Sequence, residues 1–91
     1  MQGFLELSPD EAAYVELKLA LSKRLRQLRK DRQCTQVQLA AEIASSQSRV
    51  AKMEASDPAV SLDLLIKALL ALGVTSREIG ETIATANDAA A

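Results

Sequence analysis

Residues 35–54 read TQVQLAAEIASSQSRVAKME, and this stretch decides the fold. Thr35 is followed three residues later by Gln38, which is the spacing of a capping box at a helix start. Ser46 is a second capping residue, and it comes soon after the first apolar run ends. The stretch therefore predicts two short helices, over residues 35–43 and 46–54, joined by a tight turn. The residues expected on their apolar sides are Val37, Leu39, Ala40, Ile43, Val50 and Met53.

Three further helices are predicted outside this stretch. Upstream, apolar residues recur at spacings of three and four and predict one long helix over residues 9–31, which a break near Ser22 would divide. That stripe consists of Tyr14, Leu17, Leu21, Leu25 and Leu28. Downstream, Ser61 starts a helix that ends at a left-handed Gly73. A last helix is expected over residues 76–86, with Ile79 and Ile83 facing inward and a fraying tail after it.

The composition fits a single helical domain. The chain has 91 residues, of which 48% are hydrophobic, and only three are glycine and two are proline. A chain of this length forms one domain rather than two. We therefore expect an all-α fold over residues 1–91, a compact five-helix bundle. Its parts would be a core over residues 22–73, an N-terminal helical extension over 9–21 and the C-terminal helix over 76–86.

Charge is distributed unevenly along the chain. The net charge of −1 looks unsuited to a polyanion partner, but residues 18–52 hold nine basic and two acidic side chains, a net charge of +7. The remaining residues carry −8. This separation indicates a middle segment that faces a polyanion, with a solvated helix face as the alternative.

Several classes of protein are disfavoured by the residue types that the chain lacks. It has no histidine, no cluster of metal ligands and no glycine-rich phosphate loop, so we expect neither an enzyme nor a cofactor or metal site. The lone Cys34 excludes an internal disulfide and fits a reducing compartment. The N-terminus lacks the pattern of a signal peptide, and no apolar run is long enough to span a membrane. These features predict a cytoplasmic protein.

Two short helices in a basic segment form the helix-turn-helix arrangement, here at residues 36–54, whose second helix lies in the major groove of DNA. Its surroundings add LRQLR at 25–29 and a leucine-rich helix that ends at Leu72-Gly73. With TQVQLA, SQSRV and ME inside the motif, residues 25–73 resemble the phage-repressor (Cro/XRE-type) helix-turn-helix family. The resemblance implies a lambda-repressor-like bundle. It also implies a transcriptional regulator, in most cases a repressor, that binds double-stranded DNA at a palindromic operator as a homodimer.

The same resemblance implies a role for individual residues. The positions that would read bases are Gln47, Ser48 and Lys52. The positions that would contact phosphate are Gln36, Ser46 and Arg49, where Arg49 could equally reach a base or only add charge. Two further residues, Arg29 and Glu54, would form a structural ion pair that orients the recognition helix.

One position departs from the family pattern, and one alternative function stays open. Ala44 occupies a turn position where the family usually has glycine, because the chain is left-handed there. The acidic N-terminus and the flanking helices resemble those of HigA-like antitoxins, so a second interpretation is an antitoxin that also neutralises a partner toxin. The first helix and the last helix, with Ile79 and Ile83, are the candidate dimer surfaces.

Overall fold

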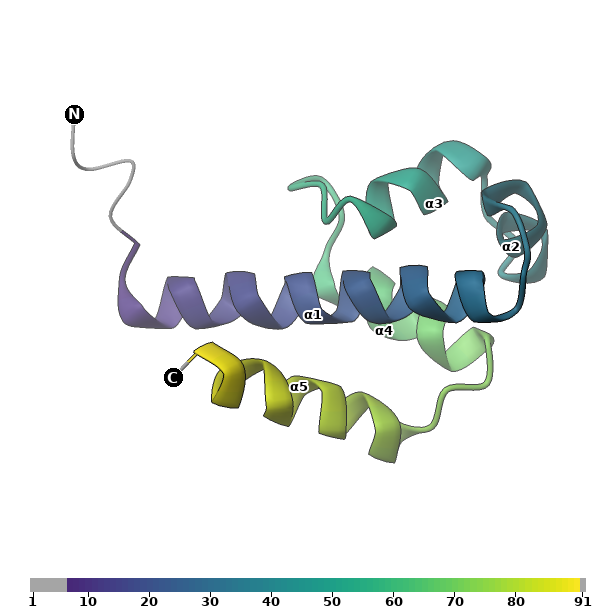
Figure 1. The fold of residues 1–91 in the computed structure, drawn as a ribbon. Coiled ribbons are helices and arrows are strands. Elements are labelled where there is room, and N and C mark those ends of the chain that lie inside the picture. The colour runs from purple at the N-terminus through teal and green to yellow at the C-terminus, as the bar shows by residue number, and fades with distance from the viewer. Residues whose placement is uncertain (1–6, 91) are drawn as a thin grey trace.

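The computed structural model of the chain describes residues 7–90, except for the side chains of residues 87–90. Within this range it contains helices only (Figure 1). They are α1 (Pro9–Asp31), α2 (Gln36–Glu42), α3 (Gln47–Glu54), α4 (Leu62–Ala71) and α5 (Ser76–Ala90). The predicted all-α, five-helix architecture is confirmed. None of the described helices is long and apolar enough to cross a membrane.

The long helix α1 organises the other four. Its start is fixed by Ser8, whose hydroxyl accepts from the backbone of Glu11 while the Glu11 carboxylate accepts from the backbone of Ser8. The helix then runs without interruption through Ser22, so the predicted break there is wrong. Ser22 is fully buried, and the helix contains no glycine or internal proline that would kink it. Along its length α5 packs on one side, α4 lies behind, and α2 and α3 sit on the opposite side (Figure 1).

The core lies under the C-terminal half of α1. Every helix contributes to it through fully or nearly fully buried apolar side chains, among them Leu21, Leu25, Leu39, Val50, Met53, Leu65, Leu69 and Ile79. Two residues of the predicted apolar stripes are exposed. Tyr14 is 46% exposed in the N-terminal part of α1, which projects past α3 and α4, and Val37 in the first turn of α2 is 63% exposed. Ile43 is only partly buried, at the edge of the core.

A left-handed residue follows each of the first four helices. Ala44 has φ = 54°, as predicted for the turn between α2 and α3, which costs an alanine about 1 kcal/mol. Gly73 has φ = 90° after α4, also as predicted. Gln33 and Ser56 have φ = 54° after α1 and α3, and neither was predicted.

The last helix is longer than its periodicity predicts. It runs to Ala90 rather than ending at Ala86, since its alanine-rich sequence favours helix and offers no terminating residue. Ile79 is buried, and Ile83 packs against the core, so both face inward as predicted. The apolar side of α5 is therefore occupied within the chain.

Candidate nucleic-acid interface

Helix α3 presents one polar row to solvent. The Ser46 hydroxyl caps its first turn by accepting from the backbone of Arg49 at 3.1 Å. Val50 and Met53 anchor the opposite side in the core. Residues four apart lie above one another on a helix, so Ser48 and Lys52 share an outward face. The three predicted base-reading residues, Gln47, Ser48 and Lys52, are all exposed on this helix.

A buried ion pair fixes the end of α3 to α1. Arg29 donates to Glu54 through Nε at 2.6 Å to Oε2 and through Nη2 at 3.0 Å to Oε1. A third donor, Nη1, reaches the carbonyl oxygen of Cys34 at 3.2 Å. The Glu54 side chain is only 5% exposed and that of Arg29 17%. Such two-pronged pairs restrict geometry as well as contributing energy, so this pair sets the angle of α3 against α1.

The network continues to the start of α3. Gln36 donates through Nε2 to Glu54 Oε1 at 3.1 Å, and its Oε1 accepts from Gln47 Nε2 at 2.7 Å. The amide of Gln36 is thus committed to two protein partners, one at each end of α3. A predicted phosphate-contacting residue and a predicted base-reading residue are therefore joined by one hydrogen bond.

The carboxyl of Glu54 is held in its charged form. Burial opposes its ionisation, but hydrogen bonds from Arg29 and Gln36, together with the positive charges of Arg29 and Arg26, outweigh that effect. The pKa of Glu54 consequently lies below its ordinary 4.5. The pKa of Arg29 is raised, chiefly by its hydrogen bonds to Glu54. The pair stays charged wherever the domain is folded at neutral pH.

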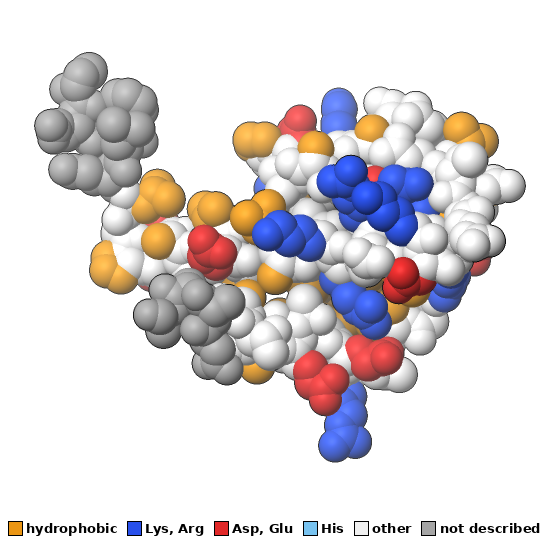
Figure 2. All heavy atoms as spheres, in the orientation of Figure 1, with side chains coloured by type: hydrophobic (Ala, Val, Ile, Leu, Met, Phe, Trp, Pro, Cys, Tyr) orange, Lys and Arg blue, Asp and Glu red, His pale blue; other side chains and the backbone are white. Residues whose placement is uncertain are grey.

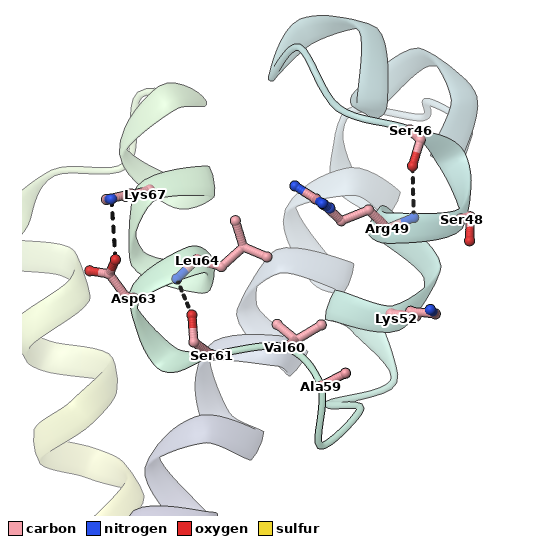
Figure 3. Close-up of a pocket in the computed structure, with 10 residues that line it drawn as sticks. All are labelled: Ser46, Ser48, Arg49, Lys52, Ala59, Val60, Ser61, Asp63, Leu64 and Lys67. Atoms are coloured by element: carbon pink, nitrogen blue, oxygen red, sulfur yellow. Dashed lines mark hydrogen bonds and ion pairs between the residues drawn. The ribbon is translucent and has the colours of Figure 1, made fainter.

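A groove of about 460 Å³ separates α3 from the start of α4 (Figure 3). Arg49 points across it toward α4, whereas Ser48 and Lys52 lie on the outer side of α3. Its far wall carries Ser61, whose hydroxyl caps α4 by accepting from Leu64 at 3.1 Å, and Lys67, paired with Asp63 at 3.2 Å. The Arg49 side chain therefore points away from the outward row into a groove whose lining also includes Ser48, Lys52 and the starts of two helices.

Ion pairs within the chain neutralise part of the positive charge of residues 18–52. Arg29 pairs with Glu54, Arg24 with Glu78 at 3.9 Å, and Arg32 with Glu42 at 3.3 Å. The basic residues of the segment with no ion-pair partner among the described residues are Lys18, Lys23, Arg26, Lys30, Arg49 and Lys52. Figure 2 shows Lys and Arg side chains gathered over the C-terminal half of α1 and beneath α3, with acidic side chains scattered around them. Positive charge is thus concentrated around the recognition helix.

Lys18 is a functional candidate that sequence reasoning missed. It is only 8% exposed, and its Nζ donates to the carbonyl oxygen of Asp57 at 2.8 Å. The backbone of Asp57 in turn donates to the carbonyl oxygen of Lys52 at 3.0 Å, which closes the end of α3 around the left-handed Ser56. Lys18 therefore ties the N-terminal part of α1 to the C-terminal cap of α3. The sequence spacing could have revealed it, because residues 18, 21 and 25 are three and four apart and therefore share one side of α1 with the buried Leu21 and Leu25.

Comparison with known families identifies this arrangement. The helix-turn-helix family model HTH_3 matches residues 25–79, which is more than half of the chain. The chain belongs to the helix-turn-helix family. Its members bind DNA, so the domain is that of a DNA-binding regulator. Searches among curated proteins and among solved structures return no significant match. The first sixteen residues of α1, Pro9–Arg24, and most of α5 lie outside the matched segment.

Proposed function

We propose that this helix-turn-helix protein is a sequence-specific repressor that binds a palindromic operator as a homodimer. The observation that carries the proposal is the outward row of α3, with Gln47 held at one end through Gln36 and Glu54 held at the other by Arg29. A recognition helix reads bases through its first turns, and its side chains must be positioned before DNA arrives. The operator-bound protein would block transcription by occupying promoter DNA.

Gln47 keeps its capacity to read a base while it is bound to Gln36. A glutamine amide has two N–H donors and one oxygen acceptor. The bond to Gln36 uses one donor, which leaves one donor and the oxygen for the N7 and N6 positions of an adenine. Lys52 would donate to a guanine, and the hydroxyl of Ser48 suits either a donor or an acceptor on a base edge.

The groove beside α3 suits the phosphate backbone. Ser46 and Ser61 cap the two helix starts in its walls, and the free N–H groups of helix starts favour anions. Arg49 lies between them, so we assign it to phosphate rather than to a base. Gln36 would contribute to phosphate binding through the backbone at the start of α2, because its amide is already engaged.

The antitoxin interpretation stays a prediction. Under that interpretation the acidic residues Glu6, Asp10, Glu11 and Glu16 would face a basic toxin. Glu6 lies outside the described residues, and the other three are exposed. Two of them already interact with the start of α1, since hydrogen bonds with Ser8 lower the pKa of both Asp10 and Glu11. We therefore place repression first.

Selection of bound duplexes from a random DNA pool tests the proposal directly. We expect the enriched sequence to be a palindrome. The double variant Gln47→Ala/Lys52→Ala should then lose at least about tenfold in preference for that sequence over random DNA, because each base contact contributes ~1–3 kcal/mol of discrimination. Its thermal stability should be unchanged, since both side chains are exposed. Arg77→Ala on α5 removes an equal charge elsewhere and serves as the control. A selection that enriches no sequence from the random pool would refute the proposal.

Salt dependence separates phosphate contacts from base contacts. Each phosphate neutralised contributes roughly −0.9 to the slope of log affinity against log salt concentration. Arg49→Ala should reduce that slope by about 1, whereas Gln47→Ala should leave it unchanged. An Arg49→Ala slope equal to that of the wild type would contradict its assignment to phosphate.

A further inference from the structure

The N-terminal half of α1 holds most of the exposed apolar surface of the described residues. Six large hydrophobic side chains are conspicuously exposed, and four of them lie between residues 7 and 19. Those four are Leu7, Tyr14, Val15 and Leu19. Figure 2 shows hydrophobic side chains along this end of the helix. Because the segment projects beyond the core and lies outside the family match, its apolar residues are not explained by the helix-turn-helix fold.

One row of residues on α1 is exposed to solvent along the helix, although Arg26 in this row also borders α3. Its members recur at spacings of three and four and are all exposed: Ala12, Val15, Leu19, Lys23, Arg26 and Lys30. We call this set the outer face of α1. It is apolar in its N-terminal half and basic in its C-terminal half. Other sides of α1 contact α3, α4 and α5.

We propose that the outer face of α1 binds the outer face of a second copy of this chain, with the two helices antiparallel and Val15 of each copy opposite Leu19 of the other. This pairing assigns a surface to the dimer of the proposed function. Only the role of the pairing on DNA rests on that function. A symmetric pair of this kind buries the same apolar stripe on both copies.

Charge favours the antiparallel direction. The N-terminal half of α1 carries exposed Asp10, Glu11 and Glu16, and its C-terminal half carries the basic residues of the outer face. Antiparallel pairing about the midpoint between Val15 and Leu19 brings Glu11 of each copy level with Lys23 of the other. Parallel pairing would align acidic residues with acidic residues. Opposite charges across an interface select the partner and fix the register.

The position of α3 fits the same arrangement. Glu54 and Ala51 of α3 lie against Arg26 and Arg29 of α1, about ten residues beyond the proposed two-fold axis. At 1.5 Å per residue this is roughly 15 Å, which puts the two recognition helices roughly 30 Å apart along the paired helices. One turn of DNA separates half-sites by roughly 34 Å.

Both recognition helices would also face the same side of the dimer. Leu19 and Arg29 are ten residues apart, which at about 100° per residue places their side chains roughly a quarter turn apart around α1. Arg29 points toward α3, so α3 stands to one side of the proposed seam rather than opposite it. A two-fold axis perpendicular to the paired helices then carries both copies of α3 to the same face, where one duplex can reach both.

The alternative dimer surface on α5 has no exposed large hydrophobic side chain among the residues whose side chains are described. Ile79 is buried, and Ile83 packs against the core of its own chain. The two other exposed large apolar residues, Val37 and Leu70, stand alone on separate helices. The outer face of α1 is therefore the apolar surface best placed to receive a second copy.

The molecular mass in solution tests the pairing. Light scattering over a concentration series should give twice the 9.8 kDa chain mass for the wild type and 9.8 kDa for Val15→Glu/Leu19→Glu. Leu70→Glu, at a residue of matching exposure on α4, should remain dimeric. At high dilution, where wild type and variant are both monomeric, circular dichroism should show the same helix content and melting, since the substituted residues are exposed in the single chain. A monomeric wild type, or a double variant that stays dimeric, would overturn the proposal.

Cross-linking tests the register. In a Cys34→Ser background, a mixture of Val15→Cys and Leu19→Cys chains should form the mixed disulfide on mild oxidation, because a disulfide needs Cα atoms within ~7 Å. Each variant alone should cross-link poorly. Efficient self-linking of Val15→Cys would indicate parallel pairing and contradict the register. DNA binding is measured separately, so a wild type that dimerises but binds no DNA refutes the proposed function and leaves the pairing intact.

Discussion

Leu19 and Leu25 lie six residues apart on one helix, yet Leu25 is fully buried and Leu19 is 37% exposed. The C-terminal half of α1 packs against other helices on the side that holds Leu25, whereas Leu19 stands on the outer face and the N-terminal half projects past α3 and α4. Apolar residues spaced by three and four predict a helix in both halves, because this spacing follows from the periodicity of the helix. Burial depends instead on which other elements reach that part of the helix, and this depends on the whole fold.

The two halves also hold the recognition helix in different ways. The C-terminal half binds the end of α3 through the charged pair Arg29–Glu54. The N-terminal half binds the cap of α3 through one hydrogen bond, from Lys18 to the backbone of Asp57. The matched helix-turn-helix segment contains the first contact but not Lys18. The N-terminal half is therefore an addition to the family fold that still reaches the site.

Substituting one leucine in each half of α1 should give the largest difference in the free energy of unfolding. Leu25→Ala should lower the free energy of unfolding by about 2–5 kcal/mol, because it opens a cavity in a packed core. Leu19→Ala should lower it by less than about 0.5 kcal/mol at high dilution, where the chain is monomeric. Urea unfolding monitored by circular dichroism measures both. If Leu19→Ala proved as costly as Leu25→Ala at high dilution, the contrast between the halves would be wrong.

Most helix boundaries could be predicted because their signals are local. Ser8, Thr35, Ser46 and Ser61 each accept a hydrogen bond from a backbone only three residues away, so their effect is visible in the sequence. The left-handed Gln33 and Ser56 were missed because neither residue type favours that conformation strongly. The C-terminal end of α5 was missed because alanine gives no stop signal.

The candidate site was less predictable, because its geometry depends on distant residues. The roles of Gln47, Ser48 and Lys52 come from the family resemblance and stay predictions. The contact between Lys18 and Asp57 joins residues 39 apart, and the groove between Arg49 and α4 depends on how the intervening loop turns. Gln36 shows the same limit, since its spacing indicated a helix start but not the amide bonds to Glu54 and Gln47.

The charged contact of the C-terminal half should be sensitive to acid. Because the pKa of Glu54 is lowered in the folded state, its contribution to stability is fully present above pH 4.5 and is lost as the pH falls through the lowered value. Glu54→Gln should therefore be less stable than the wild type by about 1.5–3 kcal/mol at neutral pH. The gap should close in acid. Urea unfolding at a series of pH values measures it, and a gap that stays constant would show that the charge of Glu54 contributes nothing.

A smaller effect than that of Glu54→Gln is expected in the N-terminal half, where Lys18 donates to a neutral backbone carbonyl. Lys18→Met keeps the apolar stem of the side chain and removes the donor to Asp57, which should lower the free energy of unfolding by about 1 kcal/mol. The loss should concentrate at the end of α3, where the backbone N–H of Asp57 is bonded to Lys52. Amide hydrogen exchange at Asp57 should accelerate by roughly fivefold, the equivalent of that free energy.

The exposed Lys30→Met is the matched control, and it should leave exchange at Asp57 unchanged. Because Lys18 is buried, its loss should weaken DNA binding without changing the salt slope, whereas a lysine that contacts phosphate would reduce the slope by about 1. A lower slope in Lys18→Met would mean that the N-terminal half of α1 contacts DNA itself. Unchanged exchange at Asp57 would mean that this half does not hold the recognition helix, and that Arg29 and Glu54 position it alone.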